Sequence, residues 1–236
     1  MTRRRKWPAT VRPVRAVSSA VQVRLATRST GEDYVTEKQW LRATLRACPW
    51  HPEGGCGFCR HGTYPRVRPR GTYIARWYCP TVRRTVSALP DALASHFSGT
   101  LAELEAHVLA VELSASLAAA ASTRRLEVEL PGALRYLSRI CKAVHKTLNI
   151  CRGLLPERLA SVPPTVTNFV QALDEHNVLI ALRPLIRQHL PQLPTPVGFN
   201  PSRHNPVARP GGLQHQTGRD PPCALLDPAI NPIADR

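Results

Sequence analysis

Residues 48–61, CPWHPEGGCGFCRH, decide the fold of this chain together with Cys79, which follows a strand-like stretch. Thiolate and imidazole side chains are the ligands that a structural zinc ion takes. The prolines and glycines between them cannot continue a helix, so the chain must turn sharply around the cysteines. Two short strands are marginal in water by themselves. The stretch therefore predicts a small β structure, a zinc ribbon, that a metal ion stabilises.

The spacing predicts one zinc ion but leaves the choice of ligands open. Cysteine at 48 with histidine at 51 forms a Cys-x2-His pair, and the cysteines at 56 and 59 form a Cys-x2-Cys pair. The cysteine at 79 lacks such a partner, because the position three residues later is Val82. The preferred ligands are Cys48, His51, Cys56 and Cys79. Cys59 can replace any of them and His61 ranks next, while a ribbon that kept its fold and lost the metal is the alternative.

The charge of the chain favours an anionic partner. Over 236 residues, 32 Lys and Arg face 16 Asp and Glu, which gives a formal net charge of +16. Such an excess attracts DNA, RNA or an acidic membrane surface, and arginine binds phosphate and guanine well. A GC-rich genome that prefers arginine codons is the alternative explanation. No run approaches the roughly 18 apolar residues of a membrane helix, so we expect no membrane partner.

The fold class predicted is mainly α-helical with a small β zinc ribbon, a helix-turn-helix-like helical domain and disordered termini. The predicted parts are a disordered basic arm (1–34), a zinc-ribbon-like domain (35–90), a helical domain (91–190) and a disordered Pro-rich tail (191–236). The acid-free composition of the arm also fits a mitochondrial transit peptide. The cysteines suit a reducing compartment better than a disulfide scaffold, and Cys223 is predicted to be a free thiol.

Local patterns predict the individual elements. A short helix begins at Thr36 and runs into the first cysteine, and residues 72–78 form a strand whose hairpin partner is 83–87. Thr100 and Glu103 match a capping box. The remaining predicted helices are 100–113, 117–122, 131–153, 165–176 and 178–190.

The helix predicted over 131–153 separates apolar from basic residues. Its apolar positions are Leu134, Leu137, Cys141, Val144, Leu148, Cys151 and Leu155. At about 100° per residue they form one continuous stripe, so the two cysteines on it are expected to be core residues. Four cations lie roughly opposite: Arg135, Arg139, Lys142 and Lys146. We interpret this basic stripe as a nucleic-acid contact, and a solvated surface is the alternative.

Several motifs resemble a family of small uncharacterised bacterial proteins associated with transposable elements. The matching motifs are Cys48-Pro, Gly55-Cys56-Gly, Arg60-His61-Gly62, Trp77-Tyr78-Cys79-Pro80, Arg84-Thr85-Val86-Ser87 and Leu89-Pro90-Asp91. The resemblance covers residues 45–155 and implies a zinc ribbon followed by a helix-turn-helix. It implies a cytoplasmic protein that binds double-stranded DNA, with a transposase or a second copy of itself as further partners. The recognition helix would be 133–146, with Arg135 and Arg139 nearest the base edges.

Two departures from the family pattern bear on this resemblance. Val82 stands where a ribbon's fourth cysteine would fall, and the link before the helix at 131 exceeds the usual three or four residues.

The nucleic-acid-binding residues predicted are Arg60, Arg66, Arg68, Arg70, Arg76, Arg83 and Arg84, with the four cations of the basic stripe.

The sequence argues against an enzyme. Its acids lie mostly on or beside predicted helices, and it contains no phosphate-binding glycine loop and no Gly-x-Ser-x-Gly elbow. We therefore expect a non-catalytic DNA-binding protein. An RNA- or ribosome-associated zinc protein is the first alternative. A protein-interaction module that forms a coiled coil through the apolar stripe is the second.

Overall fold

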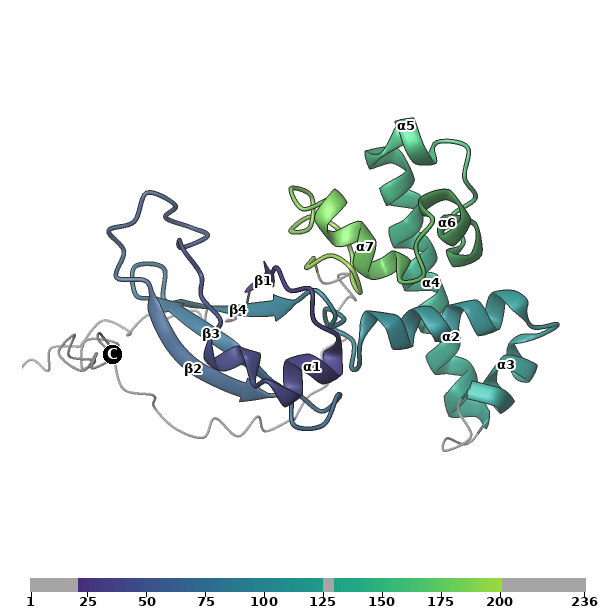
Figure 1. Ribbon diagram of the computed structural model, residues 1–236, viewed down its shortest axis with the longest axis horizontal. Coiled ribbons are helices and arrows are strands. Elements are labelled where there is room, and N and C mark those ends of the chain that lie inside the picture. Colours follow the sequence, from purple (N-terminus) through teal and green to yellow (C-terminus); the bar gives the residue numbers. More distant parts are fainter. Residues whose placement is uncertain (1–20, 125–129, 201–236) are drawn as a thin grey trace, which may run out of the picture.

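The computed structural model describes residues 21–124 and 130–200. The strands are β1 (Val21–Leu25), β2 (Cys59–Pro65), β3 (Tyr73–Cys79) and β4 (Arg84–Pro90). The helices are α1 (Gly31–Thr36), the short 3-10 helix η1 (Gln39–Leu41), α2 (Leu101–Leu113), α3 (Leu117–Arg124), α4 (Leu130–Leu154), α5 (Pro156–Leu159), α6 (Val166–Leu173) and α7 (Val178–Leu185). Figure 1 shows a twisted sheet with α1 against it, beside a group of helices arranged around the long helix α4.

The β part is a four-stranded mixed sheet rather than a two-stranded ribbon, so the prediction of a mainly α fold is wrong in this respect. Its strand order is β1-β4-β3-β2. Strand β4 pairs with β3 in the antiparallel sense. It pairs with β1 in the parallel sense, and there Val21 of β1 lies opposite Val86 of β4. The arm predicted over 1–34 is therefore wrong from residue 21 onward, while residues 1–20 lie outside the described part. Five alternating residues are too weak a local signal, and β1 becomes a strand by pairing with β4.

The two faces of the sheet pack against different parts of the chain. On one face Ala75, Trp77 and Ala88 pack with Tyr34 of α1 and Trp40 of η1. The other face contributes Ile74 and Leu89 to the large core that the helices share. Since successive strand residues point to opposite faces, the alternation in β3 decides which side chains pack on α1 and η1 and which join the helical core.

Most predicted helices are confirmed, and one is wrong. Helix α2 begins with the predicted capping box of Thr100 and Glu103, and α3 and α4 lie where the pattern placed them. Helices α6 and α7 begin as predicted but end early, at Leu173 rather than 176 and at Leu185 rather than 190. The helix expected to begin at Thr36 instead ends there: α1 is capped by Thr30 and Asp33, which form a capping box of their own. The predicted tail also begins too early, because residues 193–199 are buried.

The apolar stripe of α4 is buried inside the chain itself. Leu137, Val144, Leu148 and Cys151 are fully buried. Most of the stripe joins the main core, and Leu137 packs on the alanines of α3. This stripe is therefore not available for a coiled coil with a second chain, and that alternative is wrong for this face.

Buried charged side chains connect the helices to one another and to the sheet. Glu105 of α2 accepts hydrogen bonds from the backbone N–H groups of Val178 and Leu179, at 3.0 and 2.9 Å, at the start of α7. Arg183 of α7 is fully buried and donates to the carbonyl oxygens of Pro90 and Asp91, both at 2.9 Å. The end of β4 and the helices thus share one hydrogen-bonded core.

Candidate metal centre and basic surfaces

Four potential metal ligands come from three separate segments. Cys48 and His51 lie on the turn after η1, where the His51 N–H donates to the Cys48 carbonyl oxygen at 3.2 Å. Cys56 lies in the following loop between two glycines with positive φ, Gly55 and Gly57. Cys79 ends β3 and shares a face with Trp77, so its side chain points to the side of the sheet that this loop covers.

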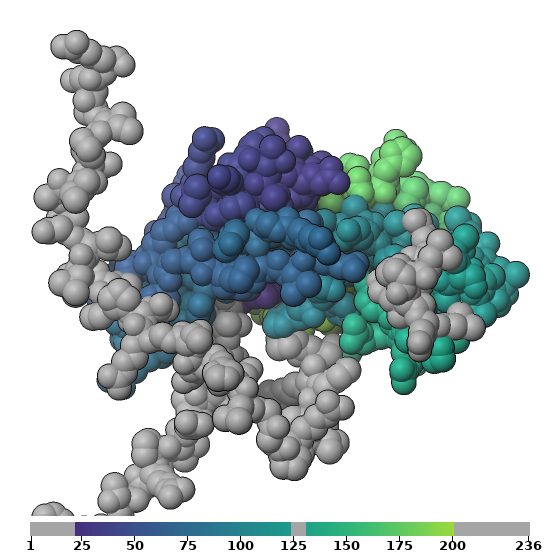
Figure 2. Space-filling model, turned by 90° about the horizontal axis from the view of Figure 1, so that it is seen from below, coloured from purple at the N-terminus to yellow at the C-terminus, as the bar shows by residue number. Residues whose placement is uncertain are grey.

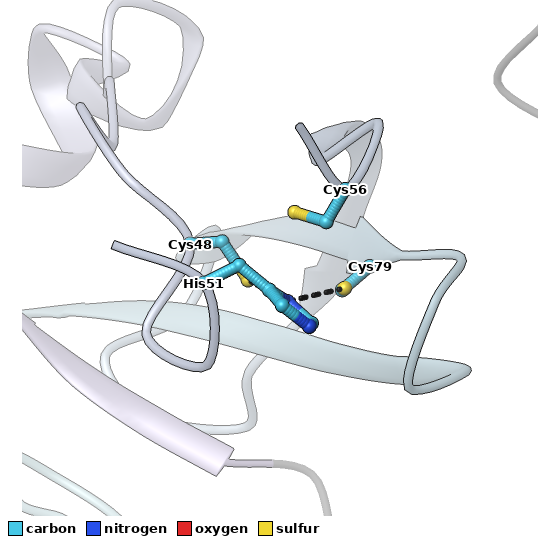
Figure 3. A group of neighbouring side chains, drawn as sticks. All are labelled: Cys48, His51, Cys56 and Cys79. Atoms are coloured by element: carbon cyan, nitrogen blue, oxygen red, sulfur yellow. Dashed lines mark hydrogen bonds between the residues drawn. The ribbon is translucent and has the colours of Figure 1, made fainter. Parts of the chain in front are cut away.

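The geometry of the four side chains suits a tetrahedral ion. Nδ1 of His51 lies 3.6 Å from Sγ of Cys48 and 3.5 Å from Sγ of Cys79, and Figure 3 shows these side chains converging. Ordinary zinc–sulfur and zinc–nitrogen bond lengths at a tetrahedral angle place the two ligand atoms about 3.6 Å apart. All four ligand atoms, including Sγ of Cys56, lie within 4.8 Å of one another. The Cys3His cluster could therefore hold one metal ion.

Backbone N–H groups point at two of the sulfurs. Burial acts to raise the pKa of Cys79, but hydrogen bonds from the N–H groups of Val82 and Thr81 and from the neighbouring thiols of Cys48 and Cys56 outweigh it and lower that pKa. Burial raises the pKa of Cys56, with an opposing hydrogen bond from the Phe58 N–H. Donors to sulfur favour the thiolate that a metal requires. Val82 thus contributes a backbone donor at the position where the sequence lacks a fourth cysteine.

Strand alternation excludes Cys59 from the cluster. Cys59 pairs with Tyr78 across the β2–β3 ladder, so it shares the face of Tyr78 and lies opposite to the face of Cys79. The ring of His61 contacts the ring of Tyr78 with centroids 5.4 Å apart, so it too lies on that second face. The preferred ligand set is the one that the structure brings together, and neither reserve residue belongs to it.

The loop around the cluster has no regular secondary structure of its own. Residues 42–58 contain no helix or strand. Their local core consists of Cys48, Cys56 and Cys79, with Trp50 and Phe58 packed against it. A metal ion held by these sulfurs could order the loop further, in addition to the packing of Ala43 and Leu45 on the sheet.

Two of the arginines predicted to bind nucleic acid, Arg60 and Arg66, bind backbone carbonyl oxygens instead. Arg60 donates to the carbonyl oxygens of Leu41 at 3.1 Å and Ala43 at 3.0 Å and also contacts that of Trp40, so it closes the end of η1. Arg66 donates to the carbonyl oxygen of Ala94 at 2.6 Å and to those of Phe97 and Gly99. Burial lowers the pKa of Arg66. Neither guanidinium is presented to a ligand.

The other predicted arginines do not form one surface. Arg83 and Arg84 are exposed at the β3–β4 turn, beside the metal cluster. Arg68 and Arg70 are exposed at the opposite end of the β2–β3 hairpin, a strand length of roughly 20 Å away. Arg76 lies between them, with its guanidinium 5.8 Å from the centre of the Tyr64 ring. The sequence grouped these residues around the metal, but the sheet separates them.

The basic stripe of α4 (Arg135, Arg139, Lys142 and Lys146) is exposed along its whole length. Within the described residues, none of these four cations forms an ion pair. The Arg139 guanidinium lies 5.5 Å from the centre of the Phe97 ring, and the Phe97 carbonyl oxygen accepts a hydrogen bond from Arg66. Phe97 therefore joins the stripe to the hairpin, a link that no sequence pattern indicated.

Several acids on or beside the helices are held by structural contacts. Asp91 forms a bidentate pair with Arg24, at 2.7 and 2.8 Å, and Glu103 caps α2. Glu105 and Glu112 cap α7 and α6. Glu127 and Glu129 lie outside the described residues.

Fold and site together define an α+β protein with a Cys3His cluster, whose cysteines are buried, at one end of its sheet and a basic helix face at the other. We found no protein-family model, no curated protein and no solved structure that matches the chain. The resemblance to transposon-associated proteins therefore stays a prediction. Among the described helices, none has both the length and the hydrophobicity needed to cross a bilayer.

Proposed function

We propose that this protein binds double-stranded DNA through the basic stripe of α4, with one structural zinc ion in the Cys3His cluster, and that it is not an enzyme. One observation carries the DNA proposal. A helix whose opposite stripe is largely buried presents four cations to solvent, and no described acid pairs with them. An exposed helix of about this diameter fits the major groove, where such side chains reach phosphates and base edges.

Zinc is the ion that this donor set favours. Three buried thiolates and one imidazole form a soft, closed, four-coordinate site, which is typical of structural zinc and leaves no open position for chemistry. The bound ion would order the loop over 42–58 and fix it to the end of β3. In this proposal the zinc stabilises the sheet and does not contact DNA, since the cluster and the stripe lie at opposite ends of the hairpin.

Metal analysis of purified protein tests the zinc site. We expect one zinc per chain in the wild type, loss of zinc in Cys48→Ser and Cys79→Ser, and full retention in the control Cys59→Ser. Cobalt substitution adds a second measurement, since thiolate-to-cobalt absorption reports the ligands directly. A wild-type protein without metal, or equal loss in Cys59→Ser, would contradict the assignment.

Fluorescence anisotropy with a labelled duplex tests DNA binding. If the four cations of the stripe contact phosphates, affinity should fall about 10²-fold between 50 and 200 mM salt. Lys142→Ala/Lys146→Ala should lower the affinity and reduce the slope of log affinity against log salt by about 2. The matched control, Arg158→Ala/Arg187→Ala, removes two exposed charges outside the stripe and should leave the slope unchanged. A salt-independent affinity, or equal effects of the two pairs, would refute DNA binding by α4.

Competition with a duplex RNA of the same sequence distinguishes the alternative of an RNA-associated protein. The deep, narrow major groove of A-form RNA does not admit a helix, so RNA should compete weakly. The resemblance to transposon-associated proteins adds a cytoplasmic setting and a transposable element, with a transposase as partner. A transposase gene next to the gene for this chain, between inverted repeats, would support that part.

A further inference from the structure

The tip of the β2–β3 hairpin, residues 66–71, is an exposed basic loop that the proposed function does not yet use. Arg68 and Arg70 are exposed there. Val67, two residues after the end of β2, is 80% exposed. Within the described part of the chain, no hydrogen bond or ion pair holds the guanidinium of Arg68 or Arg70. The loop therefore offers two unengaged cations beside an apolar side chain.

The backbone of this hairpin tip is fixed although its arginine side chains are not. Arg66 donates from Nε to the Arg68 carbonyl oxygen at 3.2 Å, while its Nη2 is bound to the loop before α2. The Thr72 carbonyl oxygen accepts from the Arg66 N–H at 2.9 Å and closes the turn. Helix α1 supports the tip from below, since a Cβ built on Gly71 would lie 3.4 Å from Cγ1 of Val35. A loop held in this way loses little conformational freedom on binding.

The tip lies beside the basic stripe. Arg66, at its base, donates to the carbonyl oxygen of Phe97, and the ring of Phe97 lies under the guanidinium of Arg139. Figure 2 shows the blue hairpin segment and the teal and green helices forming one face without a gap between them. Helix α1 adds two acids, Glu32 and Asp33. The Thr30 hydroxyl donates a hydrogen bond to Asp33, and Glu32 is exposed.

We propose that the hairpin tip enters the DNA minor groove next to the segment that α4 contacts, and that Arg68 and Arg70 give a preference for A·T-rich sequence there. The proposal rests on the proposed function. A helix in the major groove leaves neighbouring elements over the adjacent minor groove, where a basic arm can reach in. A·T tracts narrow that groove and deepen its negative potential, which attracts guanidinium groups. The exposed Val67 side chain can contact the apolar sugar edges of the groove.

Three duplexes that differ only in the flank beside the central site test the proposal. One flank is A·T-rich, one is G·C-rich, and one carries inosine in place of guanine. Inosine keeps the major-groove pattern of guanine but removes the N2 amino group from the minor groove. We expect the wild type to bind the A·T and inosine flanks about tenfold more tightly than the G·C flank.

Two variants assign the preference to the tip. Arg68→Ala/Arg70→Ala should abolish the difference among the flanks, whereas Lys142→Ala/Lys146→Ala should weaken all three complexes alike. Arg68→Lys/Arg70→Lys keeps the charge but replaces guanidinium by a more strongly hydrated ammonium, so it should retain salt-dependent affinity and lose most of the preference. An unchanged melting temperature of the alanine variant checks that the loop still folds.

The outcomes separate this proposal from the one it rests on. Equal binding of the three flanks, or an inosine flank that behaves like the G·C flank, overturns minor-groove reading while duplex binding stands. A preference that survives Arg68→Ala/Arg70→Ala overturns the assignment to the tip. A wild type that binds no duplex at room temperature and 50 mM salt, or that prefers duplex RNA, overturns both proposals.

Discussion

Replacing Glu112 by glutamine should remove one of the main connections inside the helical part. The carboxylate of Glu112, on α2, accepts from the N–H groups of Val166 and Thr167, both at 2.9 Å, at the start of α6. It also accepts from the Thr167 hydroxyl at 2.7 Å, and Nε2 of His145 lies 2.8 Å from it. An amide of the same shape has a single acceptor oxygen, and its NH2 group would face donors.

The size of the effect follows from the pKa of this carboxyl. Burial would raise the pKa of Glu112, but the hydrogen bonds from His145, Thr167 and Val166 outweigh it and lower that pKa from 4.5 to about 2. One pKa unit corresponds to about 1.4 kcal/mol, so the ionised form contributes about 3 kcal/mol to the free energy of unfolding. Because the folded-state pKa is the lower one, this contribution is complete above the unfolded pKa and is lost as pH falls toward the folded value.

Urea denaturation of wild type and Glu112→Gln, followed by circular dichroism at several pH values, measures this contribution. The difference in unfolding free energy should be about 3 kcal/mol at pH 7 and shrink to about 1.4 kcal/mol at pH 3. Comparing the two proteins at each pH cancels effects that they share, such as loss of a bound metal in acid. The control Glu157→Gln, at an exposed position of α5, should change stability by a few tenths of a kcal/mol only. A difference below about 0.5 kcal/mol at pH 7, or one that does not vary with pH, would refute the reasoning.

Three further predictions concern the metal and the core. Treatment with a chelator should expose Cys48, Cys56 and Cys79 to alkylation, while the buried thiol of Cys151 in the helical core stays protected. Mass spectrometry of the labelled peptides measures this, and uniform labelling of the four cysteines would contradict the separation of the two cores. Arg183→Met should lower the free energy of unfolding by at least about 3 kcal/mol, since several buried carbonyl oxygens lose their donor, whereas the exposed Arg187→Met should be near neutral in the same urea experiment. Leu148→Ala should cost about 2–5 kcal/mol through the cavity it leaves, yet leave DNA affinity unchanged, because this residue faces away from the basic stripe; a lowered affinity of the folded variant would count against the proposed surface.

Local patterns in the sequence were sufficient for the helices. Helix α4 could be predicted with both stripes, because a period of 3.6 residues places each side chain on one face whatever its neighbours are. The start of α2 could be predicted as well, since Thr100 and Glu103 satisfy backbone donors only three residues away. Features of this kind depend on residues within one or two turns.

The sheet could not be predicted to the same extent. Strand β1 has five residues with a short alternation, and only its pairing with β4, more than sixty positions along the chain, makes it a strand. Long-range pairs such as Arg24 with Asp91 leave no periodic signal in the sequence. For the same reason the sequence treated the arginines at 68, 70, 83 and 84 as one group, although the hairpin holds them at opposite ends.

The sequence by itself determined which residue types are present for a metal site and which helix face is basic. The tertiary structure decided which cysteines meet, because pairing of β2 with β3 turns Cys59 to the face of Tyr78 and leaves Cys56 beside Cys79. It also decided that Arg60 and Arg66 bind backbone carbonyl oxygens rather than a ligand. Side-chain type is local, whereas the choice of neighbours depends on strand register and packing, and only the folded chain fixes these.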